Sequence, residues 1–532
     1  MAWTTHDTLS SMKYKLLAFF FALLAVSCGG SEETQDPIVE VPGPALVSVS
    51  PADGTGDITA SSLTVVFTFD QNVLCSAEGQ NGIKANEGAF ISSVSPSGAN
   101  LSVLVSGLSR GKSYTLTLPA GTVKGYKQNQ KGSAAITYRF STKDPDPVEP
   151  GSWETAADAV KNMGAGWNLG NTLESNSGDV NNMWIEAKAV WNPGYKLTPT
   201  DYETAWGQPV ATRELIHMFK EAGFNAIRVP VTWYPHMGTV IVNGNFWDKS
   251  SWTGFDVDRV WLARVKEVVN YVIDEGMYCI LNVHHDTGTA TTAWLRADKQ
   301  VYASVKDRYV SLWTQIATEF ESYGERLVFE SFNEMLDVTN TWNYVSKAAD
   351  DMINTINADF VSAVRATGGN NVKRNLILNT YAASPDKRVL QDFKLPQDIS
   401  EGHLMAEVHS YAPYTFAFNP SESDTWQPKT VFDDACDREV RSIIDDVGQY
   451  LVARGIPCIL GEFGADTREG PARAESELSK QAACYVSQAA KYNIACFYWM
   501  GLSDGTDRSV PKWTKEALKN AVVQAYNDNK NN

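Results

Sequence analysis

The segment Leu327–Asp337, "LVFESFNEMLD", starts with apolar residues and ends with polar ones. Its first half is typical of a buried strand, and Asn333 and Glu334 follow directly where the apolar run ends. A buried polar side chain needs a hydrogen-bond partner, so this strand end is either part of a polar network or a place where a polar ligand binds. The rest of the chain decides whether Glu330 or Glu334 takes part in chemistry.

Seven other apolar runs of this kind lie between residues 153 and 532, separated by stretches with helical periodicity. Runs that are apolar throughout fit parallel strands covered on both faces, and eight strand-then-helix repeats predict an α/β protein with a (β/α)8 TIM barrel. A doubly wound sheet is the alternative, but it usually has fewer strands, and no glycine-rich phosphate loop follows the first run. The eight runs are "GAGWNLGNTL", "AIRVPVTW", "YCILNVHHD", "LVFESFNE", "RNLILNTY", "LMAEVHSY", "PCILGEFG" and "ACFYWMG".

Residues 45–142 have a different pattern, in which short stretches such as "LTVVFTFD" and "SYTLTLP" alternate apolar and polar residues between turn residues. This pattern predicts an all-β sandwich, and the opening "SVSPADGTGDI" resembles bacterial Ig-like domains. The segment has no tryptophan, so we expect a spacer rather than a sugar-binding module. A polar tether at 29–44 precedes it and a proline-rich linker at 143–152 follows it, so the barrel domain occupies residues 153–532.

The N-terminal residues 1–28 carry a targeting signal. Lys13 and Lys15 precede an apolar stretch that is too short to span a bilayer comfortably, and small residues then lead to Cys28. The segment resembles a bacterial lipoprotein signal, which implies that Cys28 is lipidated and anchors the protein to the membrane. The acidic "SEETQD" that follows resembles the export signals of surface lipoproteins, so we expect a surface-exposed outer-membrane lipoprotein of the cell envelope. An ordinary signal peptide is the alternative, and translation starts at either Met1 or Met12.

Composition narrows the choice of partners. The chain has 532 residues and a net charge of −17 at pH 7, so nucleic acid and anionic lipid surfaces would repel it, whereas neutral ligands would not be affected. Fifteen of the 16 tryptophans lie in residues 153–513, which fits either a site that stacks on flat faces or a large core. The seven cysteines form no CxxC pair and no zinc spacing, so we expect neither a disulfide framework nor a cysteine-bound zinc ion.

Polar and aromatic residues concentrate at the C-terminal ends of the runs, the end at which TIM barrels carry their active sites. Glu334 ends the fourth run and Glu462 ends the seventh, so the two strands lie across the barrel mouth from each other. Two facing glutamates are what glycoside hydrolysis requires, because one must donate a proton to the leaving oxygen while the other attacks the anomeric carbon or activates water. The candidate residues at the run ends are Asn168, Asn171, Arg228, Trp233, His284, His285, Asn333, Glu334, His409, Tyr411, Glu462 and Trp499.

The neighbours of the two glutamates predict which one is ionised. Arg228 near Glu462 would hold that carboxylate ionised, and a less solvated Glu334 would keep its proton. Glu330 lies four residues before Glu334 on an extended strand, so we expect it to point to the same side but deeper, where it pairs with an interior base. The run 284–286, His-His-Asp, could suggest a metal, but adjacent strand residues face opposite ways, so we expect none there.

Six motifs in this order resemble glycoside hydrolase family 5, and most closely its subfamily 4. The resemblance covers Trp153–Asn532 and implies a (β/α)8 barrel with a retaining mechanism, in which Glu334 matches the acid/base and Glu462 the nucleophile. The motifs are "GWNLGNTLES", "ETAWGQPVATRELIHMFKEAGFNAIRVPVTW", "ILNVHH", "FESFNE", "EVHSYAPY" and "ILGEFGA".

The same resemblance assigns supporting residues. Arg228 and Tyr411 would contact the nucleophile, Asn333 the sugar 2-hydroxyl, and Trp499 the sugar ring at the cleavage point. The other residues that it implies in substrate binding or support are Asn168, Trp206, His284, His285 and His409.

Resemblance to the subfamily implies an endo-β-1,4-glucanase, which we expect to be a monomer without a cofactor. Its polysaccharide substrates would be cellulose derivatives, mixed-linkage glucan or xyloglucan. An endo-β-1,4-mannanase or glucomannanase is the alternative within the family. A non-catalytic surface glycan-binding lipoprotein is the alternative outside it, and such a protein would keep the tryptophan-lined cleft but lose a catalytic glutamate.

Overall fold

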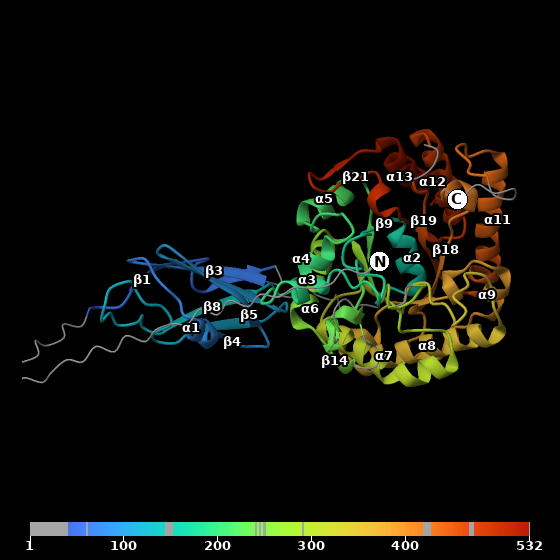
Figure 1. Cartoon of the computed structure of the whole chain (residues 1–532). Helices are drawn as coiled ribbons and strands as arrows, with labels where there is room; N and C mark the ends of the chain where they lie inside the picture. Colours follow the sequence, from blue (N-terminus) through green and yellow to red (C-terminus); the bar gives the residue numbers. More distant parts are fainter. Residues whose placement is uncertain are drawn as a thin grey trace, which may run out of the picture.

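The computed structural model describes residues 41–59, 62–143, 153–239, 242–243, 246–247, 252–289, 292–418, 427–467 and 473–530. The predicted signal with Cys28 lies outside the described residues, as do residues 29–40 of the predicted tether and 144–152 of the predicted linker. The described chain forms a smaller β-rich lobe and a larger α/β lobe (Figure 1). No helix in the described part of the chain is long and apolar enough to cross a membrane.

The smaller lobe is the predicted β-sandwich. Alternation on its strands explains the fold, since Tyr114, Leu116 and Leu118 of one strand are buried while the residues between them are not. One sheet has the order β1 (Leu46–Ser50), β3 (Ser62–Phe69), β6 (Asn100–Ser106), β5 (Phe90–Ser97). The other has the order β2 (Thr55–Ile58), β8 (Ile136–Thr142), β7 (Ser113–Leu118), β4 (Lys84–Ala85), and helix α1 (Ala77–Gly82) lies between β3 and β4 in the chain.

The larger lobe is a closed barrel of eight parallel strands, which confirms the predicted TIM barrel and excludes the doubly wound sheet. Each of the eight apolar runs supplies one strand, and the strands follow one another around the barrel in chain order. They are β9 (Ala165–Asn168), β10 (Ala226–Val229), β15 (Tyr278–Asn282), β16 (Leu327–Glu330), β17 (Leu376–Asn379), β18 (Leu404–His409), β19 (Cys458–Phe463) and β20 (Ala495–Tyr498).

Helices cover the outside of the barrel (Figure 1). Several begin at an aspartate that caps the first turn; Asp258, for example, accepts hydrogen bonds from two backbone N–H groups at the start of α6. The longer helices are α2 (Ala156–Met163), α5 (Arg213–Glu221), α6 (Arg259–Asp274), α7 (Lys299–Glu319), α8 (Lys347–Ala366), α11 (Asp434–Tyr450), α12 (Glu475–Ala490) and α13 (Glu516–Asn529). Shorter elements in the connections include α3 (Ala187–Trp191), α4 (Pro199–Glu203), β11 (Met237–Thr239), β12 (Val242–Asn243), β13 (Phe246–Trp247), β14 (Thr253–Val257), α9 (Lys387–Asp392), α10 (Tyr414–Ala417), β21 (Thr506–Asp507) and β22 (Lys512–Trp513).

The barrel interior is built in two layers because successive inward-facing residues are two apart on a strand. The lower layer is apolar and packs against α2, which closes that end of the barrel; it includes Ala226, Ile280, Val328, Ile377 and Met405. Two residues further along the same strands lies a polar layer of Arg228, Asn282, Glu330, Asn379 and Glu407, all fully buried. The polar layer therefore lies beneath the C-terminal ends of the strands, where the candidate site is.

Candidate active site

The two predicted catalytic glutamates come together at the C-terminal end of the barrel. Glu462 lies in β19, and Glu334 lies four residues after the end of β16. One carboxylate oxygen of each and one ring nitrogen of His409 all lie within 4.8 Å of one another. Both glutamates line a cleft of about 660 Å³, whose other lining residues include Asn171, His284, His285, Asn333, Trp342, Tyr411, Tyr414, Phe418, Asp466 and Trp499.

A β-bulge sets the position of Glu462. Along the β18–β19 pair, Val408 is paired with Leu460 but the next residue, His409, is paired with Glu462, so Gly461 is an extra residue in β19. A Cβ atom at position 461 would lie only 1.6 Å from Oε1 of Glu407, so only glycine fits beside that carboxyl group. The bulge therefore places the Glu462 side chain level with His409 at the barrel mouth.

Arg228 joins the polar layer to the cleft. Its guanidinium donates to both oxygens of Glu330, at 2.6 and 2.8 Å, and to Oε1 of Glu462 at 2.7 Å. It also donates to the side-chain oxygens of Asn168 and Asn333, at 3.0 and 2.9 Å. The prediction that Glu330 pairs with an interior base is confirmed, because Glu330 is fully buried and bound to Arg228 in a bidentate pair.

The surroundings shift the pKa values of the two glutamates in opposite directions. Burial alone would raise the pKa of Glu462, but the charges of His409 and Arg228 and a 2.6 Å hydrogen bond from Tyr411 hold it below its usual value. Burial raises the pKa of Glu334 above its usual value, and the nearby charge of Glu462 adds to this increase, although a hydrogen bond from His409 opposes it. A low pKa suits a nucleophile and a raised pKa suits a proton donor.

The His409 ring lies between three carboxyl groups, those of Glu334 after β16, Glu407 in β18 and Glu462 in β19. Its Nδ1 is 2.8 Å from Oε1 of Glu334 and 3.6 Å from Oε2 of Glu462, and its Nε2 is 3.1 Å from Oε1 of Glu407. Burial by itself lowers the pKa of His409, but these neighbours raise it to about 10. The ring is therefore an imidazolium near neutral pH, and each of its nitrogens donates a hydrogen bond to a carboxyl oxygen.

The aromatic and histidine candidates form one wall of the cleft. Trp499 stacks on His284 with ring centres 5.5 Å apart and an angle of 16° between the rings. His285 packs against Trp206, with centres 5.2 Å apart, and the Trp206 indole donates to the Asn176 carbonyl at 2.8 Å. Trp206 therefore contacts His285, which lines the cleft, and is itself partly exposed.

The predicted site residues divide into two groups. His284, His285, Asn333, Glu334, Tyr411, Glu462 and Trp499 line the cleft. Asn168, Arg228 and His409 are buried behind the carboxylates, so their contact is with other protein groups. The division largely follows depth along the strand, because most of the cleft residues lie just past a strand end; Glu462 is within β19 and reaches the cleft because of the bulge at Gly461.

The run 284–286 is not arranged as a metal site. Asp286 is fully buried, and its carboxylate accepts the backbone N–H groups of Trp233 and Tyr234, at 2.9 and 2.8 Å, and the indole N–H of Trp294 at 2.6 Å. Glu334, His409 and Glu462 are close enough to share an ion. A histidine ligand must be neutral, however, and the raised pKa of His409 opposes this.

Sequence reasoning missed part of the site. Asn282, Asn379 and Glu407 belong to the polar layer, where Asn282 donates to Glu330 at 2.9 Å and Asn379 lies 3.3 Å from Glu407. Counting back from the strand ends in steps of two residues could have found them, since each lies on the same strand face as a residue of the apolar layer. Trp342 lines the cleft from a loop and carries no signal in the sequence that points to the site, whereas Tyr414, at the start of α10, ends the motif "EVHSYAPY" but was not singled out.

An eight-stranded barrel whose mouth holds two close glutamates of opposite pKa shift has the architecture of a retaining glycoside hydrolase. Residues 190–505 match the cellulase family, glycosyl hydrolase family 5, and residues 40–142 match the bacterial Ig-like domain. The chain belongs to glycosyl hydrolase family 5, and its sandwich is a bacterial Ig-like domain.

Relatives and solved structures agree with this assignment. The chain is 32% identical over 413 residues to endoglucanase A of Clostridium longisporum, covering 74% of this chain and 71% of the relative. A family 5 enzyme of Prevotella bryantii, solved in complex with a xyloglucan tetradecasaccharide, is 38% identical with a TM-score of 0.60, covering 70% of this chain and 99% of that one. A GH5-4 broad specificity endoglucanase of Ruminococcus champanellensis with bound cellotriose is 35% identical with a TM-score of 0.59, covering 70% and 99%.

Proposed function

We propose that the protein is a retaining endo-β-1,4-glucanase that hydrolyses β-glucan polysaccharides by double displacement. The observation that carries the proposal is the carboxylate pair: one oxygen of Glu334 and one of Glu462 lie within 4.8 Å of each other, and the pKa values of the two groups are shifted in opposite directions. Retaining enzymes hold their carboxyl groups about 5–5.5 Å apart, whereas inverting enzymes need about 6.5–9.5 Å to admit a water molecule. The close pair therefore favours direct attack by a carboxylate.

In the first step, an oxygen of Glu462 forms a bond to the anomeric carbon as the glycosidic C–O bond breaks. Glu334 gives its proton to the departing sugar oxygen, which leaves a glycosyl ester on Glu462. In the second step, Glu334 takes a proton from water, the water oxygen bonds to the anomeric carbon, and the ester C–O bond breaks to restore the Glu462 carboxylate. Arg228 and Tyr411 hold the Glu462 oxygens in place throughout.

The substrate class rests on the relatives and on the cleft wall. The similar proteins are described as endoglucanases, and two of the similar structures hold xyloglucan and cellotriose. Trp499 offers an aromatic face at the carboxylate pair, and Trp342 and Tyr414 are 46% and 51% exposed in the same cleft. Aromatic faces stack on the apolar faces of pyranose rings, so several of them along an open cleft suit internal positions of a long chain.

An endo-β-1,4-mannanase is the second candidate, because only the axial 2-hydroxyl separates mannose from glucose at this site. Asn333, whose side-chain oxygen is held by Arg228, is the residue that we propose beside that hydroxyl. The glycan-binding lipoprotein is disfavoured, since a protein without catalysis has no need of two carboxylates with opposite pKa shifts.

The test is product release from a polysaccharide panel by residues 29–532, with the Glu462→Gln variant alongside. The panel is carboxymethylcellulose, barley β-glucan, xyloglucan, glucomannan, galactomannan and xylan. Glucan cleavage that the variant loses would establish the endoglucanase and rank its substrates. Cleavage of mannans alone would keep the mechanism and replace the substrate. A folded protein that cleaves none of the six would favour the binding-protein alternative.

We also propose that Cys28 is lipidated and holds a monomeric enzyme at the outer face of the cell envelope, with domain boundaries near residues 45, 142 and 153. The lipoprotein-like signal supports the anchor. Metabolic labelling with an alkyne fatty acid should mark the wild-type protein and not a Cys28→Ser variant. Labelling of both would place the lipid elsewhere, and labelling of neither would support an ordinary signal peptide.

A further inference from the structure

Outside the cleft, a cluster of charged side chains lies where the sandwich meets the barrel. Arg110, in the loop between β6 and β7, forms an ion pair with Asp274, the last residue of α6. Arg213 of α5 binds the other oxygen of that carboxylate at 2.9 Å. Arg110 is only 8% exposed although it lies in a surface loop of the sandwich, so the barrel covers most of its side chain.

Lys266 completes this cluster from the barrel side. It lies on α6, an outer helix, where a lysine normally extends into water, yet it is fully buried. Its ammonium group donates to the Ser109 hydroxyl at 3.0 Å and is paired with Glu319 at the end of α7. A buried ammonium group is tolerated only when it is paired and hydrogen-bonded, and here one of its partners comes from the sandwich.

A separate contact lies at the other end of α6. Arg259, the first residue of the helix, donates to the backbone carbonyl of Gly88 and lies over the Phe90 ring at 5.0 Å. Fifteen residues separate it from Asp274, which is about 22 Å along a helix. Two attachments that far apart on one helix oppose rotation of the sandwich about either of them.

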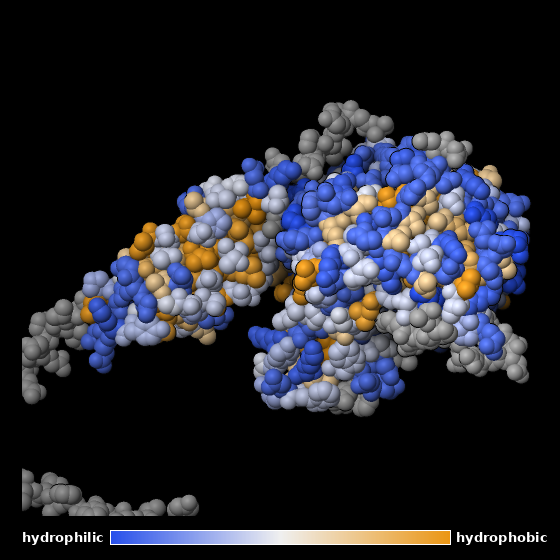
Figure 2. All heavy atoms as spheres, turned by 90° about the horizontal axis from the view of Figure 1, so that it is seen from above, coloured by the Kyte–Doolittle hydropathy of each residue, from blue (hydrophilic) through white to orange (hydrophobic). Residues whose placement is uncertain are grey.

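Charge favours the same association. Residues 45–142 hold seven lysines and arginines against five acidic residues, whereas residues 153–532 hold 35 against 49. A slightly basic sandwich thus lies against a strongly acidic barrel, and the visible face of the barrel is largely hydrophilic while that of the sandwich carries more hydrophobic residues (Figure 2). Opposite net charges attract across the whole junction, in addition to the individual ion pairs.

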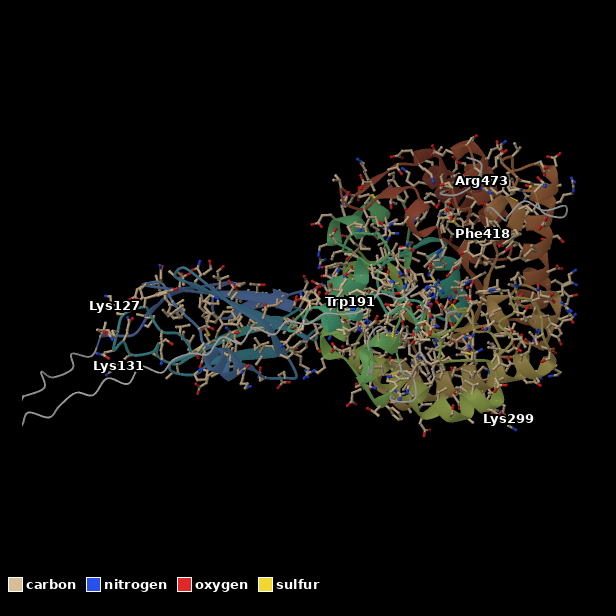
Figure 3. The ribbon with its side chains drawn as sticks, viewed as in Figure 1. Lys127, Lys131, Trp191, Lys299, Phe418 and Arg473 are labelled. Carbon is tan, nitrogen blue, oxygen red and sulfur yellow. The ribbon has the colours of Figure 1, made fainter. Side chains whose placement is uncertain are left out.

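The chain runs lengthwise through the sandwich. Val41 pairs with Asn129 and Lys131, and Lys131 lies at the end of the sandwich away from the barrel (Figure 3). Thr142, the last residue of β8, is next to Lys112 in the loop that carries Arg110, at the end that meets α6. The length of the sandwich therefore separates residue 41 from the barrel.

We propose that the Ig-like sandwich is docked on α6 as a fixed arm, so that sandwich and barrel move as one rigid body and the cleft keeps one orientation relative to residue 41. The docking surface is formed by Arg213, Arg259, Lys266, Asp274 and Glu319 of the barrel, with Gly88, Phe90, Ser109 and Arg110 of the sandwich. Two linked domains are expected to move relative to each other unless contacts between them prevent it, so the fixed orientation depends on these contacts. This inference does not depend on the proposed substrate.

The test compares residues 29–532 with an Arg110→Asp variant, which replaces the guanidinium that pairs with Asp274 by a carboxylate that repels it. Small-angle X-ray scattering of the wild type should fit a single docked arrangement. The variant should show a larger radius of gyration, a broader distance distribution and a melting temperature lower by roughly 1–4 °C. Hydrolysis of a short soluble cello-oligosaccharide should stay unchanged, which also shows that the barrel is folded.

The matched control is Lys127→Asp, the same charge reversal at the far end of the sandwich (Figure 3), which should behave as the wild type. Circular dichroism would confirm that the sandwich of each variant is folded. A wild-type scattering profile that needs many inter-domain arrangements would overturn the proposal. So would an Arg110→Asp profile identical to that of the wild type, because the ion-pair cluster would then not hold the domains together.

Discussion

Two of the charge clusters in the described barrel, one around Arg228 and one around Lys266, differ in what they face. In the first, the guanidinium binds Glu330 inside the barrel and Glu462 at the cleft, so the cluster opens on one side toward a ligand. In the second, the ammonium group is enclosed between Ser109 and Glu319 at a domain junction. Similar ion pairs therefore support catalysis where one carboxylate faces a cleft, and hold the two domains together where none does.

The largest effect is expected on activity, at Glu462 and Glu334, which face the cleft beside Arg228. Glu462→Gln removes the nucleophile but keeps its shape, so kcat should fall by about 10⁴-fold with little change in melting temperature. Glu334→Ala should lose most activity on polysaccharide but much less on an aryl glycoside whose leaving group needs no proton. A stopped assay of reducing ends measures hydrolysis of the polysaccharide, and a stopped assay of released phenol measures hydrolysis of the aryl glycoside. Near-normal polysaccharide activity in either variant would refute the assignment of roles.

The next largest effect is expected on stability, at Glu330, the buried partner of Arg228 inside the barrel. Glu330→Gln takes one charge from a bidentate pair in which both residues are fully buried, which should cost about 3 kcal/mol or more in the free energy of unfolding. Urea denaturation measures it. Glu325→Gln, at a glutamate just before the same strand, is the control and should cost less. An unfolding energy equal to that of the wild type would mean that Glu407 and Glu462 satisfy Arg228 without Glu330.

A smaller effect is expected from Tyr411→Phe. The change deletes a 2.6 Å hydrogen bond to a charged carboxylate, which is worth about 1.5–3 kcal/mol, so kcat/KM should fall roughly 10- to 100-fold. The pKa of Glu462 should rise, because one of the groups that lower it is gone. Steady-state kinetics over a range of pH measures both changes. A rate loss without a shift of the acid limb would place Tyr411 against substrate rather than against the nucleophile.

The pH profile of the wild type follows from the same shifts. Activity needs Glu462 ionised and Glu334 protonated, so kcat/KM should fall as pH drops through the lowered pKa of Glu462 and as pH rises through the raised pKa of Glu334. The plateau should therefore lie around and above the ordinary pKa of a glutamate. A profile that is flat into the alkaline range would contradict Glu334 as the proton donor.

The smallest effect is expected at the enclosed cluster. Lys266→Met keeps most of the side-chain volume, and the Glu319 carboxylate that loses its partner is 28% exposed, so water can solvate that charge and the loss of stability should be small. We expect a change in melting temperature within about 2 °C and an unchanged kcat/KM. Calorimetry and the polysaccharide assay check the two values. A loss of activity in this variant would show that the Lys266 cluster also supports catalysis, so that the two clusters would not differ in role.

The fold and the cleft carboxylates could be predicted from the sequence because each depends on a local pattern. Eight apolar runs give eight strands, and a polar residue at the end of a run, such as Glu462, stands out against its neighbours. Glu407 was not predicted because it lies inside its run and becomes meaningful only when β10 and β18 face each other across the barrel. Trp342 comes from a loop, and its place in the cleft depends on tertiary packing alone.

The bulge at Gly461 has a consequence for how this sequence can evolve. The room that a side chain at position 461 would need is occupied by the carboxyl group of Glu407 on the neighbouring strand. Substitutions at the two positions therefore depend on each other. A larger residue at 461 becomes acceptable only after a shorter residue has replaced Glu407, and a shorter residue at 407 would remove the partner of the His409 Nε2. In an alignment of descendants of this chain, the two positions should covary or stay invariant together, although only one of them adjoins a catalytic residue.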